Sequence, residues 1–311
     1  MNRRKLVKDA IAHRPTSRIP YCITFTPDGE ARLKEVIGDQ SVMDYVDNDI
    51  IQIWPPWWNW HNLGPEWKQP DIPHTPPQVS GVGSYTDFFE SLKKLRANTD
   101  KYILVMIYGS HFEKAYFSRG IENLLADLAG EPEFARSLLN RIIEKNLVML
   151  DNFLHAPEID GVLLGSDWGT QIDLIMSPDT WQEMIRPGEQ REYDLIHSHG
   201  KDVWVHSCGN VEKIIPSLIE MGLDVLNPVQ PEAMDLATLK QQYGDKLTFW
   251  GGISTQKALP YGTPAEVTAE TCRVRDLMSH NGGYILAPAQ EIQGDVPAAN
   301  ILALIETAKH G

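Results

Sequence analysis

Two side chains that can bind a metal ion, His206 and Cys208, stand two residues apart at the end of an apolar run. The run 203–208 is typical of a buried β-strand, whose side chains alternate between two faces. The imidazole and the thiol are therefore expected to project side by side, with Trp204 on the same face. Both are ligands that zinc prefers, so the pair predicts half of a zinc site. The alternative is a structural cysteine beside a hydrogen-bonded histidine.

Three carboxylates follow other apolar runs and are candidates to join that pair: Asp167, Glu232 and Glu291. A carboxylate in such a position completes a metal shell, orients the imidazole, or acts as a general acid or base. A loop cap or a salt bridge is the alternative for each of them. We predict catalytic roles for His206, Asp167 and Glu291, and metal binding by His206, Cys208 and Glu232.

Apolar runs that resemble strands recur along the whole chain, and helical patterns separate most of them. The helix signals include the segment 132–154, a start at Ser177-Pro178, and a capping box at Thr263 to Glu266 with Pro264 at the first helical position. A strand followed by a helix, repeated, is the pattern of a parallel sheet. The eight runs are 21–25, 50–54, 102–108, 161–165, 203–208, 225–229, 247–251 and 284–288.

Eight such units predict one α/β domain over residues 1–311, a single (β/α)8 TIM barrel, in which function gathers at the C-terminal ends of the strands. The reactive side chains do follow the runs rather than precede them. The alternative, an open doubly wound sheet, needs a glycine-rich phosphate turn after its first strand, and residues 26–30 contain no G-x-G-x-x-G. Side chains at the strand ends that we predict to bind substrate are Tyr108, Trp168, Asn227, Gln230, Trp250 and Gln290.

The segment after the second run departs from this plan, because five of the nine tryptophans lie within residues 54–67, among many prolines. A long loop inside a compact domain is usually a lid or a binding loop, and the density of tryptophan argues against disorder. We predict that Trp54, Trp57 and Trp58 form a stacking wall for a flat, apolar ligand. The alternative is that these rings plug one end of the barrel or form the contact of a homodimer.

The chain of 311 residues has 42 acidic and 28 basic side chains, a formal net charge of −14. This charge repels nucleic acid and anionic membrane surfaces, and no basic run offsets it. No apolar run is long enough to span a membrane and the first residues contain no signal-peptide centre, so a cytoplasmic location is expected. Three cysteines without a short-spaced framework fit a reducing compartment, and Cys22 and Cys272 are predicted to be structural.

Several short segments between residues 161 and 297 form a distinctive set: SDWGTQ at 166–171, IMSP at 175–178, HSCGN at 206–210, DVLNPVQ at 224–230, FWGGI at 249–253, and AP at 287–288 leading to DVP at 295–297. Together these segments resemble one protein family, the uroporphyrinogen decarboxylase superfamily. That superfamily includes porphyrinogen decarboxylases and zinc methyltransferases that exchange methyl groups with corrinoid proteins. The resemblance implies a (β/α)8 barrel.

The decarboxylase branch is characterised by an arginine-rich loop after the first strand, which clamps the carboxylates of the substrate. Here residues 24–32 are acidic and contain one arginine, Arg32. A substrate with eight carboxylates would be repelled by this protein, because bidentate arginine is how such groups are held. Porphyrinogen decarboxylation is therefore our second hypothesis.

The methyltransferase branch implies a zinc ion held by a His-x-Cys pair, which matches His206 and Cys208, and by a second cysteine after the last strand. The matching position here is Gln290, so one of the three carboxylates is expected to supply an oxygen ligand. Without a metal, the pair would act as acid and thiol. We predict transfer of a methyl group from a small substrate, an aryl methyl ether, to the cobalt of a separate corrinoid protein. A non-catalytic ligand-binding barrel is the third hypothesis.

Overall fold

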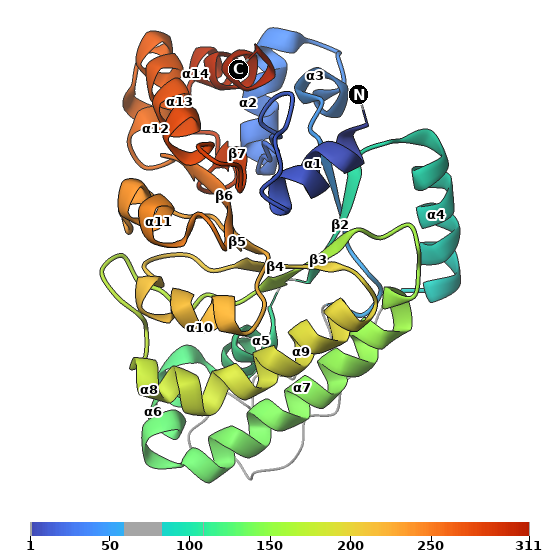
Figure 1. The fold of residues 1–311 in the computed structure, drawn as a ribbon, viewed down its shortest axis with the longest axis vertical. Coiled ribbons are helices and arrows are strands. Elements are labelled where there is room, and N and C mark those ends of the chain that lie inside the picture. Colours follow the sequence, from blue (N-terminus) through green and yellow to red (C-terminus); the bar gives the residue numbers. More distant parts are fainter. Residues whose placement is uncertain (1, 59–82, 108, 311) are drawn as a thin grey trace.

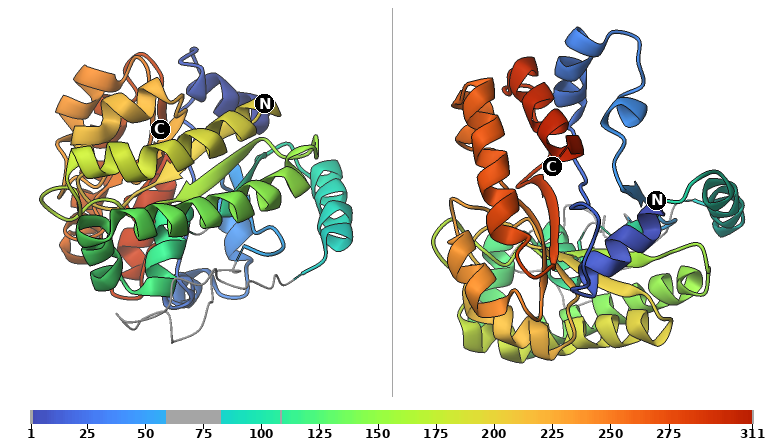
Figure 2. Two further views of the ribbon diagram at one scale, coloured as in Figure 1. Left: turned by 90° about the horizontal axis from the view of Figure 1, so that it is seen from below. Right: turned by 45° about the horizontal axis from the view of Figure 1, so that its top comes forward.

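The computed structural model describes residues 2–58, 83–107 and 109–310. Seven of its strands form one parallel sheet, in which each strand pairs with the next one along the chain. The sheet is curled and helices lie around its outer side, which makes this a TIM-barrel-like α/β fold (Figure 1, Figure 2). The strands are β1 (Ile50–Ile53), β2 (Tyr102–Ile107), β3 (Gly161–Gly165), β4 (Asp202–His206), β5 (Val225–Asn227), β6 (Thr248–Ile253) and β7 (Tyr284–Pro288).

The three helix starts that the sequence predicts, at residue 132, at Ser177-Pro178 and at Thr263, are confirmed. Ser177 caps the helix after β3 by accepting from the backbone N–H of Thr180, and Thr263 and Glu266 form the predicted capping box. Within the described residues, no helix has the length and apolar character needed to cross a bilayer. The α-helices are α1 (Arg3–Ile11), α2 (Pro27–Ile37), α3 (Val42–Val46), α4 (Tyr85–Asn98), α5 (His111–Arg119), α6 (Ile121–Gly130), α7 (Pro132–Leu154), α8 (Pro178–Thr180), α9 (Arg186–Ser198), α10 (Ile215–Glu220), α11 (Leu236–Tyr243), α12 (Ala258–Tyr261), α13 (Pro264–Met278) and α14 (Ala298–His310).

The first predicted run, 21–25, is not a regular strand, so the prediction of eight strands is wrong by one. Its backbone forms isolated bridges, from Tyr21 to β7 and from Phe25 to residue 292. On the other side, the carbonyl of Tyr21 accepts from the backbone N–H of Asp49, which precedes β1. The side chain of Asn48 bonds to both the N–H and the carbonyl of Ile23. The run therefore links the two edge strands, and a side chain replaces part of the ladder.

The N-terminal ends of the strands are covered by α1. Arg4 and Lys8 of this helix pair with Asp160, which precedes β3, and with Asp202, which begins β4. The opposite, C-terminal end of the sheet is where a ligand can enter. A separate apolar cluster fills the inside of the sheet; its buried members are Val7, Cys22, Ile50, Tyr102, Leu104, Leu163, Trp204, Val225, Trp250, Ile285 and Ala287.

Candidate active site

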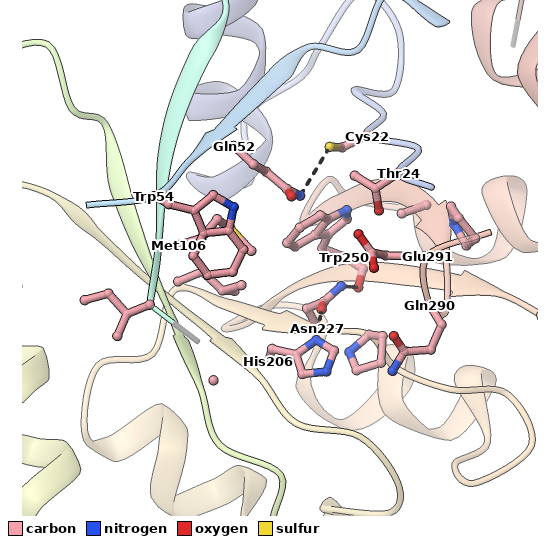
Figure 3. A pocket seen from close by; sticks show the side chains of 16 residues that line it. Cys22, Thr24, Gln52, Trp54, Met106, His206, Asn227, Trp250, Gln290 and Glu291 are labelled. Carbon is pink, nitrogen blue, oxygen red and sulfur yellow. Dashed lines mark hydrogen bonds between the residues drawn. The ribbon is translucent and has the colours of Figure 1, made fainter. Parts of the chain in front are cut away.

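A cavity of about 190 Å³ lies inside the sheet at the C-terminal ends of the strands (Figure 3). Its wall is mainly apolar and carries a few amides, one hydroxyl, one imidazole and one carboxyl group. No lysine or arginine of the described residues lines it. The lining residues are Cys22, Thr24, Gln52, Trp54, Met106, Ile107, Leu163, Gly165, His206, Asn227, Pro228, Trp250, Ala287, Pro288, Gln290 and Glu291.

The imidazole of His206 is held in one tautomer. Its Nδ1 lies 2.5 Å from Oδ1 of Asn227, and the amide nitrogen of Asn227 donates to the carbonyl of Trp250 at 3.0 Å. Because that second bond turns the amide oxygen toward the ring, Nδ1 carries the proton of the neutral imidazole. The lone pair of Nε2 then faces Sγ of Cys208 at 3.3 Å and Oδ1 of Asp167 at 3.6 Å.

Three possible metal ligands meet at this point: the nitrogen of His206, the sulfur of Cys208 and a carboxylate oxygen of Asp167, all within 4.8 Å of one another. The backbone N–H of Cys208 donates to Oδ1 of Asp167 at 2.9 Å, which holds the carboxylate beside the thiol. Zinc accepts this donor set, and a zinc-bound histidine usually donates its other N–H to an oxygen, as His206 does here. The residues present therefore fit a zinc ion.

Gln290 occupies the position where the family resemblance implies a second cysteine, and it contacts the first one. Its Nε2 donates to Sγ of Cys208 over 2.6 Å. Burial, reinforced by the negative charge of Asp167, raises the pKa of the Cys208 thiol to about 12. The hydrogen bond from Gln290 favours the charged sulfur, and a cation bound beside the sulfur would displace its proton.

Trp54 forms part of the cavity wall, and Trp58 packs against it with ring centroids 4.8 Å apart. Trp57 instead contacts Tyr85 edge-on, at 5.6 Å between centroids. Within the predicted stacking wall, Trp54 thus lines the cavity, Trp58 supports it, and Trp57 does neither. Tyr108, which we predicted to bind substrate, lies outside the described residues, as do Trp60 and Trp67, the other two tryptophans of the segment 54–67.

Three residues of the sequence prediction lie away from the cavity. Trp168 is fully buried in the apolar layer outside the sheet. Glu232 accepts from the hydroxyl of Ser254 at a separate surface hollow, so Asp167, and not Glu232, is the carboxylate beside His206. Gln230 accepts from the backbone N–H of Gly209 and so holds the loop that carries Cys208. Of the other predicted residues, Asp167 and Cys208 lie beside His206, and those that line the cavity are His206, Asn227, Trp250, Gln290 and Glu291.

Two cavity neighbours were not predicted as site residues, Glu113 of α5 and Cys22. The carboxyl group of Glu113 is only 1% exposed, and burial, together with the charge of Asp167, raises its pKa to about 8. It lies in space left free by Gly165, because a Cβ added there would be 2.6 Å from Oε2 of Glu113. Cys22, predicted to be structural, is buried and also lines the cavity. The sequence feature that could have indicated Glu113 is Gly165, a glycine at a strand end that leaves room for a neighbouring side chain.

A fully buried polar network supports the end of β3. The hydroxyl oxygen of Ser110 lies 2.7 Å from a carboxylate oxygen of Glu189 and 2.7 Å from one of Glu192, and Nδ1 of His111 lies 3.2 Å from Glu189. Although burial alone would lower it, these two carboxylates raise the pKa of His111 to about 9. The charged imidazole compensates the burial of the carboxylates. Because Ser166 also donates to Glu189, the network holds the residue that precedes the metal-ligand candidate Asp167.

The fold and the position of the cavity define an α/β-barrel protein with its site at the C-terminal ends of the strands. Residues 68–311 match the model of the family described as uroporphyrinogen decarboxylase (URO-D). Since this match covers most of the chain, the protein belongs to the URO-D family. No curated protein sequence matches it.

Among solved structures, the fold is similar to a methyltransferase from Methanosarcina mazei, with a TM-score of 0.71 and 17% sequence identity. That similarity covers 100% of this chain and 99% of the other. A 3-keto-D-glucoside 4-epimerase from E. coli is more distant, at a TM-score of 0.44 and 12% identity, over 73% of this chain and 86% of the other. At these identities the similarity concerns the fold.

Proposed function

We propose that this protein is a methyltransferase that takes the methyl group of a neutral aryl methyl ether and passes it to the reduced cobalt of a separate corrinoid protein. The observation that carries the proposal is the meeting of the His206 nitrogen, the Cys208 sulfur and the Asp167 carboxylate beside a small apolar cavity. Membership of the URO-D family and the fold shared with a methyltransferase support the choice of reaction.

The size and charge of the cavity support a neutral substrate with one ring. A cavity of about 150 Å³ admits benzene, so the volume of about 190 Å³ here suits a single substituted ring and not a tetrapyrrole. The one arginine of residues 24–32, Arg32, is engaged with the carbonyl of Gly294 and with Glu35. Porphyrinogen decarboxylation, the second hypothesis, therefore lacks the cations that would hold the substrate's carboxylates.

In the proposed reaction, the bond between the methyl carbon and the ether oxygen breaks and its electron pair stays on the oxygen. The methyl carbon forms its new bond with the electron pair of the reduced cobalt, and the oxygen takes up a proton to give a phenol. A phenol has a pKa of about 10, so releasing it as an anion at pH 7 costs about 4 kcal/mol relative to the protonated product. The site has to supply an electrophile or an acid of that order.

The residues of this chain offer two groups that could assist the departure of the phenol oxygen. Zinc held by Asp167, His206 and Cys208 would supply a Lewis acid for the ether oxygen. On the other side, Glu291 lines the cavity, and burial raises the pKa of its carboxyl group, which favours the protonated acid. The ring of Trp54 offers a flat face against which the aromatic substrate packs.

The proposal is tested by mixing the protein, under reducing conditions, with a reduced corrinoid protein and a panel of methoxyarenes, methylamines, betaines and methanol. Methylation of cobalt, followed by its absorbance, is expected with the methoxyarenes and is expected to be lost in the His206→Ala, Cys208→Ala double variant. If no donor methylates cobalt, the proposal fails. Turnover of uroporphyrinogen would establish the decarboxylase instead, and full function of the double variant would favour a non-catalytic barrel.

A further inference from the structure

The indole N–H of Trp250 is a hydrogen-bond donor without an acceptor. Trp250 lines the cavity and is only 5% exposed, and its Nε1 has no hydrogen-bond partner within the part of the chain that the structure describes. A buried donor that remains unpaired costs about 1–3 kcal/mol, so such groups are normally satisfied by protein, water or ligand. The buried indoles of Trp168 and Trp181 are also without a partner among the described residues. Of these three rings, Trp250 is the one that lines the cavity, so its N–H is the donor that a ligand in the cavity can pair.

The neighbouring Trp204 shows what a satisfied indole looks like in the same cluster. The two rings meet edge to face with centroids 5.3 Å apart, and both belong to the apolar cluster inside the sheet. The indole N–H of Trp204 donates to the hydroxyl of Tyr102 at 3.0 Å. Of these two neighbouring rings, Trp204 has its N–H paired within the protein, whereas the N–H of Trp250 has no partner among the described residues.

The surroundings of Trp250 limit the chemistry of the missing acceptor. Figure 3 shows the nitrogen edge of Trp250 on the side of the pocket where Thr24 and Glu291 lie, whereas His206 and Asn227 lie on another side. No lysine or arginine of the described residues lines the cavity, and Glu291 is the acidic group on this wall. A carboxylate on the ligand would be buried in this mainly apolar cavity without a balancing cation. The acceptor that fits is a neutral oxygen.

We propose that Trp250 is a specificity-determining residue, whose indole N–H donates to a neutral oxygen substituent on the ring of the methyl donor, away from the ether that reacts. This inference rests on the proposed function for the identity of the ligand as a methoxyarene. A ring without the second oxygen would leave the N–H of Trp250 unpaired in the complex. Sites built to hydrogen-bond a substrate group discriminate strongly against analogues that lack it.

Binding measurements test the inference separately from turnover. Dissociation constants are measured by calorimetry for methoxybenzene and for methoxybenzenes that carry a para hydroxyl, methoxy, acetyl or carboxylate group. The wild-type protein is expected to bind the neutral oxygen-bearing rings about 5- to 150-fold more tightly than methoxybenzene, and the carboxylate more weakly than those. Trp250→Phe is expected to bind methoxybenzene and the neutral oxygen-bearing rings with nearly equal affinity. Trp204→Phe, the matched control, is expected to keep the wild-type preference.

Equal binding of methoxybenzene and the oxygen-bearing rings by the wild type, or an unchanged preference in Trp250→Phe, would overturn the inference, as would no binding of any of these rings. A selective protein that never methylates cobalt would keep the inference and refute the proposed function. If Trp250→Phe does not fold, the indole N–H proton resonances of the wild type decide the matter. One of them should move downfield with the oxygen-bearing rings and stay in place with methoxybenzene.

Discussion

Replacement of Asn227 by alanine tests whether its side chain fixes the tautomer and orientation of His206, the candidate zinc ligand. The variant removes the oxygen 2.5 Å from Nδ1, which fixes the tautomer and the orientation of the ring. Loss of the partner of a metal-bound histidine typically weakens metal affinity 10- to 100-fold, which is about 1.4–2.7 kcal/mol. We therefore expect Asn227→Ala to bind zinc 10- to 100-fold more weakly, as measured by competition with a chromophoric chelator at fixed pH.

The matched control is Asn300→Ala, because Asn300 is an equally buried amide on α14 that bonds to the carbonyls of Leu259 and Gly262, remote from the site. It is expected to lower the free energy of unfolding without changing the affinity for zinc. If Asn227→Ala folds and binds zinc as tightly as the wild type, the reasoning from the tautomer is refuted. The same holds if Asn300→Ala weakens binding as much.

Three further predictions concern neighbouring groups. The purified wild type should contain close to one zinc per chain by elemental analysis and Cys208→Ala almost none; equal contents would show that the sulfur is not a ligand. Gln290→Cys should bind zinc more tightly than the wild type in the chelator competition, since it restores the sulfur of the family pattern; unchanged or weaker binding would contradict this. Glu113 has a folded-state pKa of about 8, above its ordinary value of 4.5, so the folded state holds this proton more tightly and the wild type loses stability as pH rises toward 8. The free energy of unfolding in urea should therefore rise for Glu113→Gln relative to the wild type between pH 5 and pH 9, by a few kcal/mol at about 1.4 kcal/mol per pKa unit. A difference that stays constant with pH would argue against a buried neutral acid.

Local patterns predicted the parts of the site that a single strand positions. His206 and Cys208 lie side by side as predicted, although β4 ends at His206. The backbone N–H groups of Ser207 and Cys208 donate to Asn227 and Asp167, and these bonds hold the two residues after the strand in place. Parallel strands also bring their C-terminal ends together, so Asp167 after β3 meets the pair that ends β4. The helix starts depended on caps that are local in sequence and were confirmed for the same reason.

The sequence predictions were wrong where tertiary contacts determine the direction of a side chain or the pairing of a strand. Trp168 follows a strand as Trp54 does, but the direction of its loop buries it outside the sheet, and alternation says nothing beyond the end of a strand. Glu232 follows β5 and reaches Ser254 instead of the pair, because the course of the loop sets its direction. The run 21–25 has the composition of a strand, yet the side chain of Asn48 takes over part of its hydrogen bonding.

The most direct test of the role given to His206 and Cys208 is a single-turnover experiment under anaerobic conditions, with protein in excess over reduced corrinoid protein and a phenolic methoxyarene. Phenol product and methylated corrinoid are quantified from the same quenched samples. We expect the two products to appear in equal amounts with the wild type, and neither with the His206→Ala, Cys208→Ala double variant. Products formed equally well by the double variant, or no transfer by the wild type, would contradict a methyl transfer that depends on this pair.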